Sequence, residues 1–225
     1  MKNASSLLLA AALLTVVSCG NNRSSKKLPT KQPVNPITKS EGTYRATFAP
    51  INGHLGDDVE GTATVVVKGD TFTAKVTANN TAASMVHTQS IHVASECPTL
   101  SSDANKDGVV DAAEGKASYG AVMVPLNHTL EVGNTVYPMA DFTGNYFYRN
   151  EVALNTMMEK LKLNEGLNFE NKVIVIYGVA ANAVVPETVA AVDGVTIHSS
   201  LPVACGSFAK IADEEGTNTN GGKEE

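Results

Sequence analysis

The stretch TATVVVKGDTFTAKVTA, residues 62–78, carries the clearest structural pattern in the chain. Its two halves, 62–68 and 71–78, are rich in valine and threonine, and β-branched side chains of this kind favour strands. Between them stands Gly69-Asp70, a two-residue loop of the kind that closes a tight hairpin. The stretch therefore predicts two antiparallel strands joined by a turn.

The pattern around this hairpin predicts an all-β domain. Upstream, Tyr44, Ala46 and Phe48 alternate with polar residues, as in a half-buried strand. Only residues 151–162 show a helical stripe. Many short strands between turn signals indicate an antiparallel Greek-key sandwich or barrel. Further strands are expected at 86–94, 120–125, 129–137, 144–149, 172–179 and 202–211.

Residues 1–18 have the layout of an export signal. Lys2 supplies a short positive region, residues 7–17 form an apolar run, and the small residue Ser18 precedes Cys19. The apolar run is shorter than the roughly 20 residues that a membrane-spanning helix needs. We therefore predict a lipoprotein signal peptide whose cleavage leaves Cys19 as the lipid-bearing N-terminus. The alternative is an ordinary secretory signal, with Cys19 merely near the cut.

The rest of the chain is expected to be one domain between two polar ends. Residues 19–40 are rich in Asn, Ser, Lys and Pro and predict a flexible tether, and residues 212–225 predict a disordered acidic tail. Residues 41–211 lie between them. A mature chain of this size fits one domain with a sizeable core.

The net charge and the predicted export signal limit the classes of partner that the protein can bind. The formal net charge is -6, and loss of Lys2 with the signal makes it -7, so no basic patch is available for nucleic acid. The predicted partners are the membrane, through the lipid on Cys19, and an unknown envelope or extracellular ligand. Gly20, rather than Asp, after the cysteine resembles lipoproteins sent to the outer membrane of a cell with two membranes.

The remaining two cysteines form an even pair. With Cys19 assigned to lipid, Cys97 and Cys205 are left in an exported compartment that permits disulfides. We expect them to be bridged.

The most specific chemistry in the chain is DANKDGVVDAAE, residues 103–114. Calcium prefers six to eight oxygen ligands, and a 12-residue loop supplies them from positions 1, 3, 5, 7, 9 and 12, with glycine at position 6 for the turn. Gly108 stands at that sixth position. The alternative is an acidic surface turn that binds nothing. The expected ligands are Asp103, Asn105, Asp107, the Val109 carbonyl, Asp111 and Glu114.

The surroundings of this loop favour a structural site over a sensor. A calcium sensor changes the angle between two amphipathic helices. Pro98 stands just before the loop, and Gly115 and Gly120 follow it, so both helices are expected to be missing. The loop is therefore expected to be an insertion between strands that holds one shape.

Four stretches of the chain share features with one family. Residues 86–92, VHTQSIH, look like a histidine-rich strand followed by a first bridging cysteine at Cys97. Residues 173–178, VIVIYG, look like a late strand, and residues 201–206, LPVACG, like a closing strand with the second bridging cysteine. With the hairpin turn at 69–70, they resemble copper/zinc superoxide dismutase-like sandwiches and the related chordin-type repeat domains. The resemblance is greatest to a bacterial lipoprotein subgroup with an inserted calcium loop, and it implies the fold and the disulfide.

The same resemblance implies that the copper site is lost. The family's two copper-binding histidines on the early strand correspond to Ser90 and His92, the late-strand histidine to Tyr177, and the arginine that attracts superoxide to Pro202. The calcium insertion stands in place of the zinc loop. His87 is five residues from His92 and so falls on the opposite face of a regular strand. One remaining imidazole does not make a redox copper site.

Two functions remain. The first is a non-catalytic, calcium-binding envelope lipoprotein whose sandwich presents a binding surface. The second is a divergent copper- or zinc-binding protein, or a superoxide dismutase-like enzyme, built around His92. No nucleophile motif or phosphate-binding loop is present in the sequence, so we predict no enzymatic activity.

Overall fold

A computed structural model describes residues 40–55, 58–163, 167–190 and 192–212. The chain divides into two units, residues 1–36 and 37–225, and the described residues all belong to the second. The predicted signal peptide and Cys19 lie outside the described residues. Of the predicted tether only residue 40 is described, and of the predicted tail only residue 212. Among the residues that the structure describes, none of the helices has the length and hydrophobicity of a membrane span.

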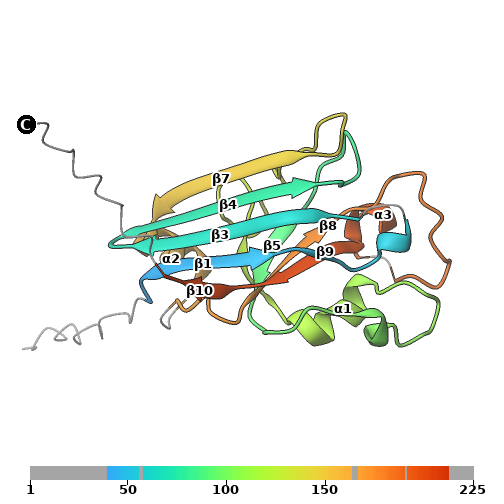
Figure 1. The fold of residues 1–225 in the computed structure, drawn as a ribbon, viewed down its shortest axis with the longest axis horizontal. Helices are drawn as coiled ribbons and strands as arrows, with labels where there is room; N and C mark the ends of the chain where they lie inside the picture. Colours follow the sequence, from blue (N-terminus) through green and yellow to red (C-terminus); the bar gives the residue numbers. More distant parts are fainter. Residues whose placement is uncertain (1–39, 56–57, 164–166, 191, 213–225) are drawn as a thin grey trace, which may run out of the picture. The chain divides into compact units, whose positions relative to one another are not determined.

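The predicted hairpin forms the centre of the first sheet (Figure 1). Strand β3 (Glu60–Lys68) pairs with β4 (Thr71–Asn79) in a register that places Lys68 opposite Thr71, so Gly69 and Asp70 make the turn. Gly69 has a φ of +54°, which glycine adopts without a steric penalty. Strands β1 (Gly42–Thr47), β7 (Tyr146–Ala153) and β10 (Ala209–Ile211) complete the antiparallel order β10-β1-β3-β4-β7.

The second sheet has the order β2-β9-β8-β5-β6, also antiparallel throughout. Its inner face packs on the first sheet around Ile91, Ile174 and Ile176, all fully buried. The expected class, an antiparallel all-β sandwich, is confirmed by this arrangement. The strands are β2 (Ala49–Pro50), β5 (Gln89–His92), β6 (Val122–Pro125), β8 (Val173–Tyr177) and β9 (Pro202–Ser207).

The chain passes between the two sheets at two buried phenylalanines. Phe48 separates β1 from β2, and Phe208 separates β9 from β10, so each pair of strands shares one continuous segment. A Cβ at Gly206 would stand only 2.7 Å from the Thr47 carbonyl oxygen, so glycine allows β9 to approach β1 closely. Both crossings connect the β10-β1 side of the first sheet to the β2-β9 side of the second.

The strand expected at 129–137 is wrong, because this segment is a loop. The completely buried side chain of Asn127 hydrogen-bonds backbone groups of this segment that a neighbouring strand would otherwise pair with. Its amide donates to the carbonyls of Glu131 and Asn134 at 2.7 and 3.0 Å, and its oxygen accepts from the backbone of Thr129 and Glu131. One asparagine therefore satisfies backbone groups that a strand would have paired in a ladder.

Other boundaries moved by a few residues. The expected strand 86–94 is regular only in β5, and Val86 makes an isolated bridge to Met139. The expected helix 151–162 begins only at Leu154, because residues 151–153 extend β7 along the hairpin. The remaining short elements are α1 (Ala112–Tyr119), α2 (Leu154–Leu161), α3 (Ile197–Ser200) and the 3₁₀ turns η1 (Gly53–Leu55) and η2 (Leu100–Ser102).

Candidate functional site

The predicted calcium loop runs directly into a helix, α1 (Ala112–Tyr119). Asp111 caps this helix, since its Oδ1 accepts from the N–H groups of Ala113 and Glu114 at 2.8 and 2.9 Å. In turn, Glu114 Oε2 accepts from the Asp111 N–H at 3.1 Å, which completes a capping box. The expectation that both flanking helices are missing is therefore wrong for the second one. On the other side of the loop lies only the turn η2.

The helix was missed because it has almost no apolar stripe. Only Gly115 and Tyr119 are buried in it, and glycine inside a helix counts against one. Glycine is needed there because a Cβ at position 115 would stand 2.6 Å from the Tyr119 ring. The Asp111 to Glu114 spacing is the sequence signal that could have found this helix.

The loop is shaped by its own side chains. Asp103 accepts from the N–H groups of Asp107 and Gly108 at 3.2 and 2.8 Å, and Gly108 has a φ of +90°, a conformation that suits glycine. Glu114 reaches across the loop, where its Oε1 accepts from the N–H groups of Ala104 and Asn105 at 2.9 and 3.2 Å. Residues from both ends of the loop thus meet inside it.

The donor set fits calcium in its chemistry. It consists of carboxylate, amide and carbonyl oxygens, which hard cations prefer, and a carboxylate oxygen that accepts one hydrogen bond still has a second lone pair. In this conformation the carboxylates bind backbone N–H groups, and within the described residues no three His, Cys, Asp or Glu side chains are gathered to hold a metal ion. Calcium binding would therefore draw these carboxylates together.

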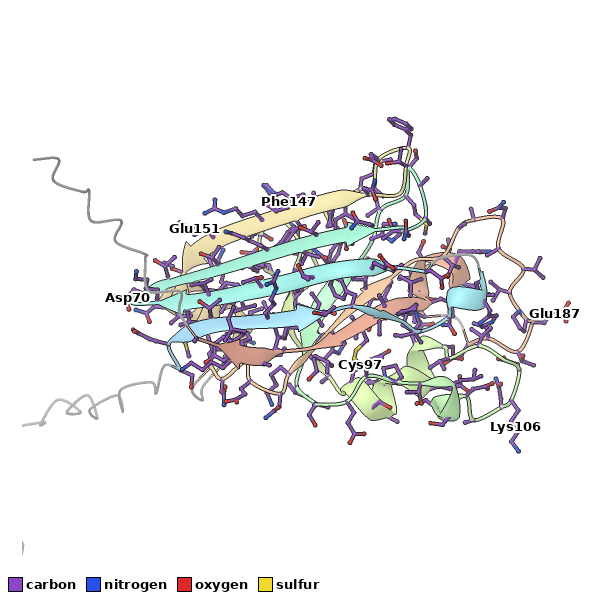
Figure 2. The ribbon with its side chains drawn as sticks, viewed as in Figure 1. Asp70, Cys97, Lys106, Phe147, Glu151 and Glu187 are labelled. Atoms are coloured by element: carbon purple, nitrogen blue, oxygen red, sulfur yellow. A yellow bond between two sulfur atoms is a disulfide. The ribbon has the colours of Figure 1, made fainter. Side chains whose placement is uncertain are left out.

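Two contacts tie the loop to the segment before α3. The Thr188 hydroxyl donates to Asp107 Oδ2 at 2.6 Å, and this hydrogen bond lowers the pKa of that carboxyl. The Ala190 N–H donates to Asp111 Oδ2 at 2.8 Å. Figure 2 shows Lys106 of the loop and Glu187 at the same end of the domain. No sequence pattern predicts this pairing, because the partners lie 81 and 79 residues apart.

Asn52 connects the loop to the second sheet. Its buried amide donates to the carbonyls of Val110 and Pro202, both at 2.9 Å, and its oxygen accepts from the Val110 N–H at 3.0 Å. No pattern in the sequence distinguishes Asn52 from the asparagines on the surface. It holds the end of the loop against the start of β9.

The predicted disulfide Cys97–Cys205 is present, with a Cα–Cα distance of 5.6 Å. Cys205 belongs to a small buried cluster with Tyr119, Val173 and Val175 on the outer face of the second sheet. Tyr119 comes from α1, so the helix, the bridge and the sheet pack together.

Ser90, His92 and Tyr177, which the resemblance places at former copper-ligand positions, lie together in the structure. His92 Nε2 is 2.9 Å from Ser90 Oγ and 3.2 Å from the Tyr177 hydroxyl, and His92 Nδ1 is 3.1 Å from the Gly120 carbonyl oxygen. Because a carbonyl only accepts, Nδ1 carries the proton and Nε2 accepts from the hydroxyls.

Burial keeps this network neutral. Desolvation lowers the pKa of His92 and raises the pKa of Tyr119 and of Tyr177, so the uncharged form of each is favoured. The Tyr119 ring covers His92 with a centroid distance of 4.5 Å. Of Ser90, His92 and Tyr177, only His92 offers an imidazole nitrogen of the kind that copper and zinc prefer, so these three residues do not supply the several imidazoles of a redox copper site.

His87 lies apart from this network, on the core side of the sheet. Its ring stacks on Tyr146 of the first sheet at 5.7 Å, and its two nitrogens are each 3.0 Å from a carbonyl oxygen, of Tyr177 and of Ala82. His87 and His92 therefore lie on opposite faces of the second sheet, as expected from their spacing.

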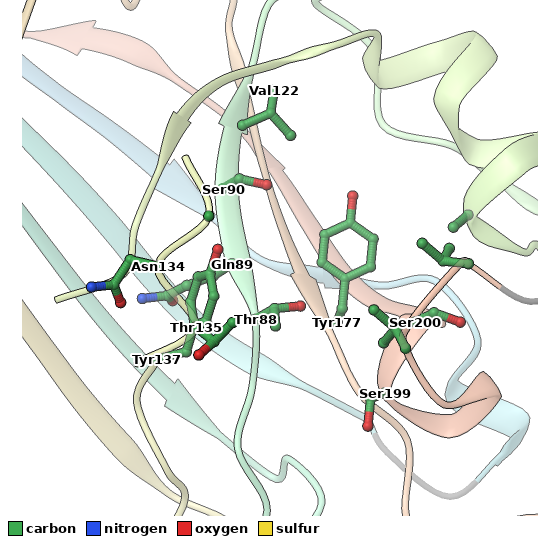
Figure 3. A pocket seen from close by; sticks show the side chains of 14 residues that line it. Thr88, Gln89, Ser90, Val122, Asn134, Thr135, Tyr137, Tyr177, Ser199 and Ser200 are labelled. Carbon is green, nitrogen blue, oxygen red and sulfur yellow. The ribbon is translucent and has the colours of Figure 1, made fainter. Parts of the chain in front are cut away.

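A groove of about 450 Å³ opens beside the network (Figure 3). Its floor is formed by β5, by Thr88 just before that strand, and by Tyr177 of β8; Thr88 and Tyr177 are half-buried and Ser90 is buried. Tyr137, from the loop that Asn127 organises, lines one side, and Val192 lines another. No sequence pattern predicts this groove, because its walls are loops that meet only in the folded chain.

No protein-family model matches the chain, and no curated protein does. The structure is similar to that of a double mutant of a SOD-like protein from Bacillus subtilis, with 13% sequence identity and a TM-score of 0.41. The match covers 72% of this chain and 95% of that one.

Proposed function

We propose that the protein is a calcium-binding lipoprotein of the bacterial cell envelope, whose β-sandwich presents a binding surface and catalyses no reaction. The calcium assignment rests on one observation: the loop 103–114 ends inside helix α1. The twelfth loop residue, Glu114, lies in the first turn of α1, and its carboxylate reaches back across the loop to the N–H groups that follow Asp103. This brings oxygen donors from both ends of the loop to its inside.

The envelope assignment rests on the N-terminal sequence. A signal over residues 1–18 exports the chain, and lipid on Cys19 anchors it to the membrane, so the domain faces an envelope or extracellular ligand. A disulfide between Cys97 and Cys205 is consistent with such an oxidising compartment.

The absence of catalysis is supported by the setting of Ser90. Its hydroxyl contacts a neutral histidine, as in a hydrolase, but that histidine nitrogen is shared with Tyr177. β5 is a central strand with β8 and β6 on either side, so its N–H groups serve the ladders and none is directed at an oxyanion.

Calorimetric titration of the purified domain with calcium tests the proposal. Wild type should bind one calcium ion, Glu114→Gln should bind it at least about tenfold more weakly, and Glu187→Gln should behave as wild type. Glu187 is the matched control because it is an exposed carboxylate at the same end of the domain. Absence of calcium binding in wild type would refute the assignment.

A divergent copper or zinc protein is the second candidate, favoured only by the proximity of Ser90, His92 and Tyr177. Metal analysis separates the two functions, because stoichiometric copper or zinc in the purified protein would support the second. We expect no superoxide dismutation above the metal-only background after loading with both metals.

A further inference from the structure

We propose that the groove beside Tyr177 binds an uncharged, largely apolar small molecule that carries a hydroxyl or carbonyl group, and that the loop 103–114 controls its affinity. The proposal deepens the proposed function, because its second half rests on calcium binding to that loop. Its first half stands on the groove alone.

The size and the lining of the groove determine the class of ligand. A volume of about 450 Å³ lies in the range of small-molecule sites, about 300–1,000 Å³. Its described lining contains no Asp, Glu, Lys, Arg or His, although the protein as a whole is acidic. A charged ligand would lose its hydration there without gaining a partner of opposite charge.

The lining combines apolar surface with hydrogen-bonding groups. Val122, Val192 and Val195 are 52, 41 and 40% exposed, and they border the groove. In Figure 3, Tyr137 and Tyr177 lie on opposite sides of Thr88, so two aromatic rings flank a hydroxyl on the floor. An apolar body with one or two polar atoms matches this arrangement.

The polar ends of the chain are poor candidates for the occupant. The tether 19–40 carries lysines and the tail 212–225 carries acidic residues, with few apolar side chains in either. Either segment would bring charges to a lining that offers none. We therefore assign the groove to a separate small molecule.

The calcium loop holds two walls of the groove through Asp111. One oxygen of this carboxylate caps α1, whose first residue, Ala112, lines the groove, and the other accepts from Ala190, two residues before the lining residue Val192. A cation that fixes the loop would also fix the spacing of these walls. Ligand affinity should then rise with calcium and, by linkage, calcium affinity should rise with ligand.

A pair of probes with the same aromatic skeleton tests the ligand class. N-phenyl-1-naphthylamine is uncharged, and 1-anilinonaphthalene-8-sulfonate is the same molecule with a sulfonate. Fluorescence titration of wild type should give saturable binding of the uncharged probe, at least about tenfold tighter than that of the sulfonate. Equal affinity for the two probes, or no saturable binding of the uncharged one, would overturn the groove assignment.

A matched pair of variants locates the probe. Val192→Asp puts a carboxylate on the groove wall and should weaken binding of the uncharged probe by about tenfold or more. Val184→Asp makes the same change at a valine that is 89% exposed and outside the groove lining, and should leave binding unchanged. Equal effects of the two variants would place the probe elsewhere and overturn the assignment.

The proposed coupling between calcium and the groove is tested by repeating the titration of the uncharged probe in calcium and in chelator. Calcium should tighten binding of the uncharged probe by about fivefold or more in wild type and not in Glu114→Gln. If calorimetry shows calcium binding but probe affinity does not change, the coupling is overturned while the calcium assignment stands. If calorimetry shows no calcium binding, the proposed function fails, and the comparison of Val192→Asp with Val184→Asp still decides the groove.

Discussion

Asp111 joins three parts of the molecule through one carboxylate. It is only 3% exposed, it caps α1 with Oδ1, and it accepts from Ala190 with Oδ2. A side chain with this many partners is costly to remove, because three partly buried N–H groups would lose their acceptor at once. Its structural role is independent of any metal.

Replacing Asp111 by alanine should therefore destabilise the domain even in chelator. We expect a loss of about 2–4 kcal/mol in the free energy of unfolding, from the lost cap and the unpaired Ala190 N–H. Asp111→Asn keeps one acceptor oxygen and should lose less. Urea unfolding in chelator measures both, with the exposed Asp193→Ala as control. An alanine variant as stable as wild type would contradict the capping role.

His92 makes stability depend on pH. Burial lowers its pKa in the folded protein below the ordinary value of 6.5 that it has when unfolded, so the unfolded chain binds the proton first as pH falls. The stability that neutral His92 contributes is fully present above about 6.5 and is lost as pH falls from there through the folded pKa.

The corresponding variant is His92→Gln, which does not titrate. Its deficit in unfolding free energy relative to wild type should be larger at pH 7.5 than at pH 5, because acid removes the contribution from wild type alone. Urea unfolding of both proteins at the two pH values gives the difference, and carboxylate titration is common to both. A deficit that is the same at the two pH values would mean that His92 is not held neutral.

At the scale of elements, sequence patterns were most informative where pairing is local. The hairpin 62–78 matches β3 and β4 almost residue for residue, because alternation and a two-residue turn fix both register and direction. The stripe in 151–162 identified α2 but not its start, because β4 continues to pair with residues 151–153. Long-range pairing overrode the local preference there.

The mispredicted elements depend on single polar side chains, whose hydrogen bonds leave no repeating pattern in the sequence. Residues 129–137 contain strand-favouring residues, yet Asn127 folds them into a loop. Helix α1 depends on the Asp111 cap and on Gly115 rather than on an apolar stripe. Calcium binding by residues 103–114 stays a prediction. The sequence correctly predicted the disulfide and, through the family resemblance, singled out the Ser90, His92 and Tyr177 positions, which lie together. It could not identify Asn52, Thr188 or the groove, whose contacts join distant segments.

Asn127→Ala tests this account of the 127–137 loop. Loss of four hydrogen bonds to a completely buried side chain should cost about 2–4 kcal/mol of unfolding free energy. Asn134→Ala, in the same loop, removes a side chain that accepts one hydrogen bond and should cost about 1 kcal/mol or less. Chemical unfolding compares them, and equal losses would show that Asn127 does not organise the loop.

At the scale of the whole molecule, the proposed lipid anchor and the folded domain are separate features of the chain. Cys19→Ser should abolish incorporation of labelled fatty acid in a bacterial host, because the thiol is the site of attachment. A Cys97→Ser variant is the control, since its lipid labelling should remain. Unchanged labelling of Cys19→Ser would exclude the lipoprotein assignment.

Within the domain, the disulfide and the calcium loop restrain the same structure. The bridge joins residues 108 positions apart and fixes the chain six residues before Asp103 to β9. In the chain-entropy model a bridge of that span stabilises by about 4–5 kcal/mol, although measured values are often lower. Calcium at 100 times its dissociation constant adds about 2.7 kcal/mol by binding the folded state alone. Near the other end of the loop, the Asn52 amide hydrogen-bonds both Val110 and Pro202, the first residue of β9.

Because both restraints act on one loop, their effects should not be additive. The melting temperature of wild type should rise with calcium. In the Cys97→Ser, Cys205→Ser double variant, the loop is released at its first end, so calcium binds a less ordered site and its rise should be smaller. Glu114→Gln should lose most of the calcium-dependent rise with the bridge intact. Thermal unfolding of the three proteins in calcium and in chelator measures these differences, and an equal rise with and without the bridge would mean that the disulfide and the loop stabilise the fold independently.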